Sequence, residues 1–160
     1  MEIRKITAED IPGIITLVHV CFGDIPLDFT IGVDDGRYML MVDGKKIVAM
    51  SGIVYDPTLK AAELDYTCTD PNYVGNGYMT ELLRTMLNDM PQLVYASAWK
   101  PYGRNRAPIG DILIKLGFIP VMFEYKRFAY GVNCHTRCPN HCVEGCECYC
   151  DLYRRVGAIV

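Results

Sequence analysis

The first hydrophobic pattern along the chain is helical. Its apolar positions recur three or four residues apart, so they would line one face of a helix. They are Ile11, Ile14, Ile15, Val18 and Cys21. Thr7 precedes them, and Asp10 stands three residues after Thr7, a pairing typical of a capped helix N-terminus. We therefore expect a short strand over residues 2–6 and a helix that Thr7 opens.

The next hydrophobic stretches have the pattern of strands. Runs over 37–42 and 45–55 are rich in β-forming residues and are separated by Asp43-Gly44, a strong hairpin signal. The remaining predictions are a strand over 61–69, a helix to about Asn88, a strand over 93–99, a helix over 109–116 and an extended segment over 118–128. This order predicts an α/β fold with a mixed sheet and helices packed on it.

Composition narrows the class of protein. The chain has 160 residues, 51% of them hydrophobic, and a net charge of −3. It can bury a core, and it lacks the basic excess of nucleic-acid-binding proteins. The apolar stretch near the start is short and is interrupted by Pro12 and Gly13, so we expect neither a cleavable signal nor a membrane span. The expectation is a cytoplasmic protein, with neither nucleic acid nor membrane as partner.

The composition changes after residue 130. We expect an α/β domain over 1–130 and a cysteine-rich tail over 131–160, which could be a metal-binding appendage. Its cysteines are Cys134, Cys138, Cys142, Cys146, Cys148 and Cys150, with His135 and His141 among them. They could bind zinc, two metals or an iron–sulfur cluster. Redox disulfides and free thiols are the alternatives, because no zinc-ribbon spacing occurs.

Two glycines stand directly before the predicted amphipathic helix that ends near Asn88. Gly75 and Gly77 permit positive φ and close approach of a ligand to the backbone. The helix that follows would offer unpaired N–H groups and its positive dipole end to a phosphate. The plainer interpretation is an ordinary turn between a strand and a helix.

The surrounding residues resemble a known family. Pro71 to Gly77, followed by Leu82-Leu83, resembles the acetyl-CoA signature of the GNAT N-acetyltransferase superfamily. Lys115 to Phe118 is similar to its Leu-Gly-Phe turn, and the resemblance covers about residues 1–128. It implies the acyl-CoA N-acyltransferase fold, in which helices flank a mixed, mostly antiparallel central sheet. Two positions depart from the family's pattern. Asn72 stands where the family usually has Arg or Gln, and Val74 stands where Arg is common.

The resemblance also implies the residues that bind acetyl-CoA. The turn and the start of the helix would hold the pyrophosphate, the preceding strand would pair with the pantetheine arm, and an asparagine would stand ahead of the later helix. These residues are Val74, Gly75, Asn76, Gly77, Tyr78, Met79 and Thr80 for the turn, Cys68 and Thr69 for the strand, and Asn105.

Acetyl transfer to an amine requires a base and a donor for the oxyanion. Strict alternation along residues 61–69 would place Glu63, Asp65, Thr67 and Thr69 on one face. Glu63 matches the family's general base, Asp65 is the second candidate, and the Thr69 N–H is the oxyanion donor by analogy. Either acid could instead be a solvated strand residue. Leu113 stands at the position of the family's usual acid, a tyrosine, for which Tyr95, Tyr102 or Tyr125 could substitute.

The loop over 23–36 carries four acidic residues, Asp24, Asp28, Asp34 and Asp35. In this family the segment often walls the acceptor site, so the acids favour a small cationic amine or a peptide amine. A solvated loop is the plainer interpretation. The sequence thus predicts an acetyl-CoA-dependent N-acetyltransferase, monomeric or homodimeric. The alternative is a weakly active or inactive CoA-binding domain that responds to metal or redox state through its cysteines.

Overall fold

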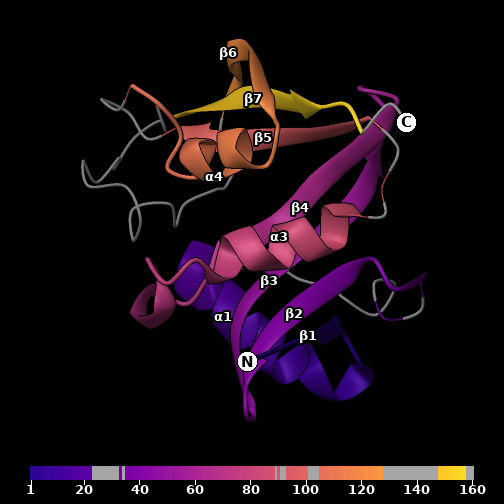
Figure 1. Cartoon of the computed structure of the whole chain (residues 1–160), viewed down its shortest axis with the longest axis vertical. Helices are drawn as coiled ribbons and strands as arrows, with labels where there is room; N and C mark the ends of the chain where they lie inside the picture. Colours follow the sequence, from indigo (N-terminus) through magenta and orange to yellow (C-terminus); the bar gives the residue numbers. More distant parts are fainter. Residues whose placement is uncertain are drawn as a thin grey trace. The chain divides into compact units, whose positions relative to one another are not determined.

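The computed structural model describes residues 1–22, 33, 35–88, 90, 93–100, 105–127 and 148–157. The chain divides into two compact units (Figure 1). The first consists of Met1–Val54 and Asp65–Asp89, and the second of Tyr55–Leu64 and Met90–Val160. Strand β4 (Ala61–Thr69) begins in the second unit and ends in the first.

Three antiparallel strands open the first unit: β1 (Glu2–Lys5), β2 (Tyr38–Asp43) and β3 (Lys46–Asp56). Asp43 pairs with Lys46, and Gly44 between them has φ = +61°, which confirms the predicted hairpin. The predicted helix start is also confirmed. The N–H of Thr7 donates to Oδ2 of Asp10 over 2.8 Å, at a short 3-10 turn η1 (Ala8–Asp10) that leads into α1 (Ile11–Phe22).

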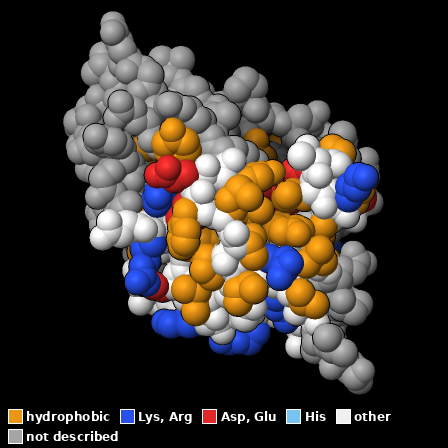
Figure 2. Space-filling model, turned by 90° about the horizontal axis from the view of Figure 1, so that it is seen from above, with side chains coloured by type: hydrophobic (Ala, Val, Ile, Leu, Met, Phe, Trp, Pro, Cys, Tyr) orange, Lys and Arg blue, Asp and Glu red, His pale blue; other side chains and the backbone are white. Residues whose placement is uncertain are grey.

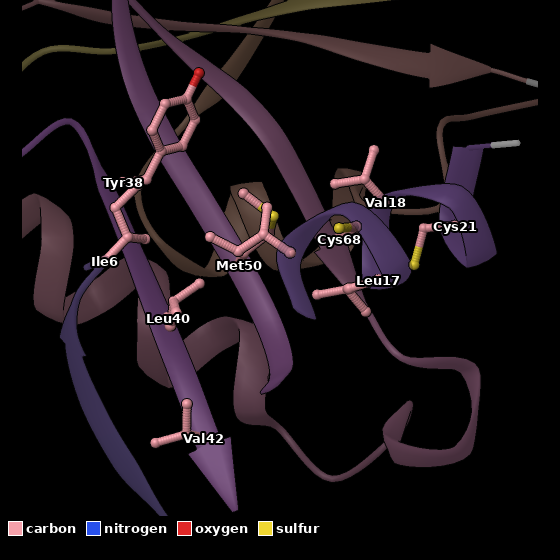
Figure 3. Close-up of a cluster of buried hydrophobic side chains, with 10 residues drawn as sticks. Ile6, Leu17, Val18, Cys21, Tyr38, Leu40, Val42, Met50 and Cys68 are labelled. Carbon is pink, nitrogen blue, oxygen red and sulfur yellow. The ribbon is translucent and has the colours of Figure 1, made fainter. Parts of the chain in front are cut away.

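A buried hydrophobic cluster joins α1 to β2 and β3 (Figure 3). Its members are Ile6, Ile14, Leu17, Val18, Cys21, Tyr38, Leu40, Val42, Met50 and Cys68. Because β2 contributes alternate residues to this face, the opposite face of the strand needs a second cover. Helix α3 (Tyr78–Asn88) contacts β2 and buries an apolar stripe of its own, Met79, Leu82, Leu83, Met86 and Leu87. The fixed position of α3 sets the position of the turn that precedes it, η2 (Pro71–Tyr73) and residues 74–77.

The second unit is built on β5 (Val94–Lys100), which pairs in parallel with β4 at Ala62↔Val94 and Glu63↔Tyr95. Helix α4 (Gly110–Lys115) and strand β6 (Ile119–Arg127) follow. The seven strands have the order β1-β2-β3-β4-β5-β7-β6. Of the five pairings whose register the structure describes, four are antiparallel and one is parallel. The predicted mixed, mostly antiparallel α/β fold is confirmed.

The end of the chain differs from expectation. Residues Tyr149–Arg155 form β7, which pairs antiparallel with both β5 and β6. These residues therefore belong to the sheet. Cys148, just before β7, and Cys150, within it, are 0% and 5% exposed, like apolar residues of a core. The cysteine-rich composition gave no sign of this strand. The expected boundary at residue 131 lies outside the described residues.

Large hydrophobic side chains are exposed on β6, namely Ile119, Val121, Met122 and Phe123. Figure 2 shows hydrophobic side chains gathered on the face seen from above, with lysines and arginines among and around them. Within the described part of the chain, no helix is long and apolar enough to cross a membrane.

Candidate functional site

The glycine turn has an open geometry. Gly75 and Gly77 have φ of +88° and +80°, values that side-chain-bearing residues rarely adopt. A Cβ atom added at either position would find no other atom within 4 Å. The two glycines are therefore required by backbone conformation and not by packing, and the space over them is available to a ligand.

Asp70 anchors the start of this turn. Its N–H donates to the carbonyl of Val48 over 2.8 Å, and its Oδ1 accepts from the N–H of Asn72 over 2.8 Å. Its Oδ2 lies 2.9 Å from Nζ of Lys46, which also stands 4.8 Å from the ring centroid of Tyr73. Burial opposes ionisation of Asp70, but the Asn72 N–H and the Lys46 ammonium together hold its pKa below the usual range.

The first turn of α3 completes an anion-binding arrangement. The N–H of Glu81 donates to the carbonyl of Gly77 over 3.1 Å. The earlier N–H groups, those of Tyr78, Met79 and Thr80, have no acceptor within the helix. They add to the positive end of the helix dipole. Val74, Gly75, Asn76 and Gly77 are exposed, so backbone donors can reach a phosphate there. Asn76 is turned to the loop itself, because its Nδ2 donates to the carbonyl of Tyr73 over 3.1 Å.

The end of β4 is pinned beside the turn. The thiol of Cys21, on α1, donates to the carbonyl of Thr69 over 3.3 Å. Since the N–H of Asp70 is bonded to Val48, the peptide group after Thr69 is held at both ends. Cys68 is 4% exposed and belongs to the core cluster. The sequence identified Cys68 and Thr69 but gave no signal for the role of Cys21.

The expected alternation along β4 is wrong at Tyr66. This residue has φ = +43°, which interrupts the regular strand. Asp65 and Tyr66 both contact Tyr38: the Tyr38 hydroxyl donates to Oδ2 of Asp65 over 2.5 Å, and the two tyrosine rings lie 6.5 Å apart. The Thr67 hydroxyl instead lies 2.7 Å from that of Ser51. The four polar residues therefore do not share one face.

Asp65 has a perturbed carboxyl group. Burial raises the pKa of Asp65, while the Tyr38 hydroxyl, the Tyr66 N–H and the charge of Arg37 oppose that rise. Burial and the neighbouring Asp65 also raise the pKa of Tyr38 above its usual range. Perturbed groups of this kind are frequent at functional sites.

The other predicted residues lie in the second unit. Glu63 is 9% exposed and stands opposite Tyr95 in the β4–β5 register. Asn105 is exposed ahead of α4. Leu113 is fully buried in α4, where it packs as a core residue. Tyr95 and Tyr125 are half-buried, and Tyr102 lies outside the described residues.

The metal prediction finds no support. Among the described residues no group of three or more His, Cys, Asp or Glu side chains could hold a metal. Cys134, Cys138, Cys142, Cys146, His135 and His141 lie outside the described residues, as do Asp24, Asp28 and Asp34 of the acidic loop. Asp35 is described: it is exposed and pairs with Arg37.

Residues 2–102 match a family model described as an acetyltransferase (GNAT) domain. That match covers more than half of the chain. The chain belongs to the GNAT acetyltransferase family. The resemblance to this family in the sequence is thereby confirmed, and acetyl transfer from acetyl-CoA is supported as the general class of reaction for this GNAT protein.

Solved structures share the fold. A GNAT-family acetyltransferase from Bacillus cereus ATCC 10987 is 14% identical with a TM-score of 0.69, over 98% of this chain and 97% of that one. An aminoglycoside 6'-N-acetyltransferase complexed with coenzyme A is 12% identical with a TM-score of 0.69. The match covers 97% of this chain and 96% of that one.

A third structure is N-acetylglutamate synthase from Neisseria gonorrhoeae complexed with coenzyme A and L-arginine. It is 11% identical with a TM-score of 0.63, over 98% of this chain but 33% of that one. No curated protein matches the sequence. At these identities the structural matches show the fold alone, and a shared fold does not determine the acceptor.

Proposed function

We propose that this protein transfers the acetyl group of acetyl-CoA to the amino group of a small cationic amine or a peptide. The observation that carries the proposal is the turn at Gly75 and Gly77, open to a ligand and followed directly by the N-terminus of α3. Its donors are backbone N–H groups, which suit the two phosphates of a pyrophosphate. Lys46 is already paired with Asp70, so the backbone and dipole would supply most of the attraction.

The proposed chemistry assigns roles on and beside β4. When bound, acetyl-CoA supplies a thioester whose acetyl group the amine nitrogen attacks. Glu63 is the proposed base that takes the amine's proton, directly or through water, with Asp65 as the second candidate. The Thr69 N–H is the proposed donor to the oxyanion, and the pinning of the next peptide group by Cys21 and Val48 supports a fixed geometry there. The bond from carbon to sulfur then breaks, and the CoA thiolate leaves.

A pair of glycine substitutions tests the cofactor assignment. Gly75→Val places a side chain over the turn, and Gly44→Val is the matched control. Gly44 also has positive φ and open space, but it lies in the β2–β3 hairpin. Both variants should lose about 1–2 kcal/mol of stability from backbone strain.

Only Gly75→Val should lose acetyl-CoA binding in calorimetry. Tight binding by a folded Gly75→Val variant would contradict the proposed cradle. Equal loss of binding in both variants would do the same, because it would place the effect in overall stability.

A further inference from the structure

A carboxylate and three aromatic rings gather in the first unit. Oδ2 of Asp65 accepts from the Tyr38 hydroxyl over 2.5 Å. The ring of Tyr66 lies 6.5 Å from that of Tyr38 and 6.1 Å from that of Phe22, with the latter pair nearly perpendicular at 77°. Asp65, Tyr66 and Phe22 are half-buried, so they remain partly accessible to a ligand.

The backbone is arranged to keep these groups together. Tyr66 holds a left-handed conformation, φ = +43°, which costs free energy in a residue with a side chain. Tyr38 is the cross-strand partner of Gly52, and a Cβ atom added at Gly52 would lie 2.2 Å from the Tyr38 ring. Figure 3 shows the Tyr38 hydroxyl pointing away from the rest of the labelled cluster.

The charges around Asp65 leave room for a cation. None of the ion pairs among the described residues includes Asp65. Its hydrogen-bond donors are the neutral Tyr38 hydroxyl and the Tyr66 N–H. The charge of Arg37 acts on Asp65, but Arg37 is itself engaged with Asp35, the Arg37 Nε lying 2.6 Å from Oδ2 of Asp35. A half-buried carboxylate without its own counter-ion attracts an ammonium group, and aromatic faces add to that attraction.

We propose that Asp65, with the rings of Tyr66 and Phe22, binds an ammonium group of the acceptor that does not itself react. The acceptor is thus an amine with a second cationic group, one end held at Asp65 while the other is acetylated. Tyr38 is a positioning residue that orients the carboxylate. This inference rests on the proposed function, because the bound amine has a role only if acetyl transfer occurs.

The test compares two acceptors that differ by one cationic group, 1,4-diaminobutane and 1-aminobutane, with acetyl-CoA saturating. We expect kcat/KM to favour the diamine by about 10- to 100-fold, the range of a hydrogen bond between charged groups. Asp65→Asn keeps the shape and the oxygen that accepts from Tyr38 but removes the charge. It should abolish the preference, by lowering kcat/KM for the diamine more than kcat/KM for 1-aminobutane. Asp111→Asn is the control, an exposed acid that pairs with Arg106 over 2.7 Å.

Two binding measurements separate this inference from the proposed function. Calorimetry with 1,4-diaminobutane and CoA should show binding that is lost in Asp65→Asn and retained in Asp111→Asn. Acetyl-CoA binding should be equal in all three proteins. Absence of acetyl-CoA binding in the unmodified protein would overturn the proposed function alone. Absence of diamine binding there, or unchanged binding in Asp65→Asn, would overturn the ammonium site.

A second variant keeps the test decisive if Asp65→Asn fails to fold. Tyr66→Leu removes a ring and leaves the carboxylate. Loss of a cation–π contact should weaken diamine binding about 3- to 30-fold without changing acetyl-CoA binding. Unchanged diamine affinity in Tyr66→Leu would overturn the role of the rings.

Discussion

Arg4 and Asp10 show how one ion pair can also cap a helix. The two terminal nitrogens of the Arg4 guanidinium lie 2.6 and 2.8 Å from the two carboxylate oxygens of Asp10, which also accepts from the N–H of Thr7. The Arg4 hydrogen bonds are the main cause that lowers the pKa of Asp10 to about 2. Because the pKa of Asp10 is lowered on folding, the ionised carboxylate stabilises the folded chain.

We expect Asp10→Asn to lower the free energy of unfolding at pH 7 by about 1–2 kcal/mol, after allowance for the partly exposed arginine. The contribution is fully present above the unfolded pKa of 3.8 and is lost as the pH falls through about 2. Urea unfolding at pH 7 and pH 2.5 measures the difference. Glu9→Gln, an exposed neighbour, should change stability little at either pH, and a constant Asp10→Asn effect would contradict the linkage.

The contribution of Asp65 to the free energy of unfolding should depend on pH in the opposite sense. Its pKa is raised in the folded chain, so the folded form holds a proton that the unfolded form releases. Stability from this group is present below the unfolded pKa and declines as the pH rises through the folded value. Asp65→Asn should therefore gain free energy of unfolding relative to the unmodified protein between pH 3.5 and 7. Chemical unfolding across that range measures it, and a loss that grows with pH would refute the assignment.

Among the elements, β2 and β3 pack closely at the pair Tyr38 and Gly52. The Tyr38 ring is 6% exposed and its hydroxyl is bonded to Asp65, so it cannot swing aside at little cost. Gly52→Ala would place a Cβ 2.2 Å from that ring and should cost about 1–3 kcal/mol. Gly13→Ala, whose nearest neighbour is the flexible end of Ile47 at 3.0 Å, should cost less or stabilise α1. Thermal unfolding of the two variants compares them, and equal losses would contradict the argument.

The elements that the sequence predicted were those marked by a few characteristic residues close together in the chain. Thr7 and Asp10 marked the start of the first helix, Asp43-Gly44 marked the hairpin, and Gly75 with Gly77 marked the open turn. The interruption at Tyr66 was not predictable, because a tyrosine gives no sign of positive φ. Nor was the Tyr38–Asp65 contact, since it joins residues 27 positions apart and depends on strand register.

Across the whole molecule, the succession of helices and strands along the chain followed from the pattern up to β6, whereas β7 was not predicted. Six strands alternate or run apolar in ways that periodicity detects. Cys148 lies just before β7 and Cys150 near its start, and the density of cysteines before them favoured metal chemistry instead. The family resemblance came from short motifs and predicted the family correctly, whereas the acceptor depends on contacts that no motif encodes.

Ligand binding should stabilise the whole chain if the turn holds acetyl-CoA. A ligand that binds only the folded state adds about 2.7 kcal/mol to the free energy of unfolding at 100 times its Kd. Thermal unfolding with increasing acetyl-CoA should therefore show a rising Tm for the unmodified protein. Gly75→Val should show no rise and Gly44→Val should show one. A flat Tm in the unmodified protein would contradict cofactor binding.

The position of β7 has a consequence for how the protein is made. In sequence it follows β6, but in the sheet it stands between β5 and β6. During synthesis, at about 5–20 residues per second, both β5 and β6 emerge from the ribosome before the strand that pairs with each of them. Their unpaired edges, with the exposed hydrophobic side chains of β6, are available for wrong pairing until β7 arrives. The second unit should thus be the part of this protein most dependent on chaperones, and a nascent chain stalled before residue 149 should bind them longest.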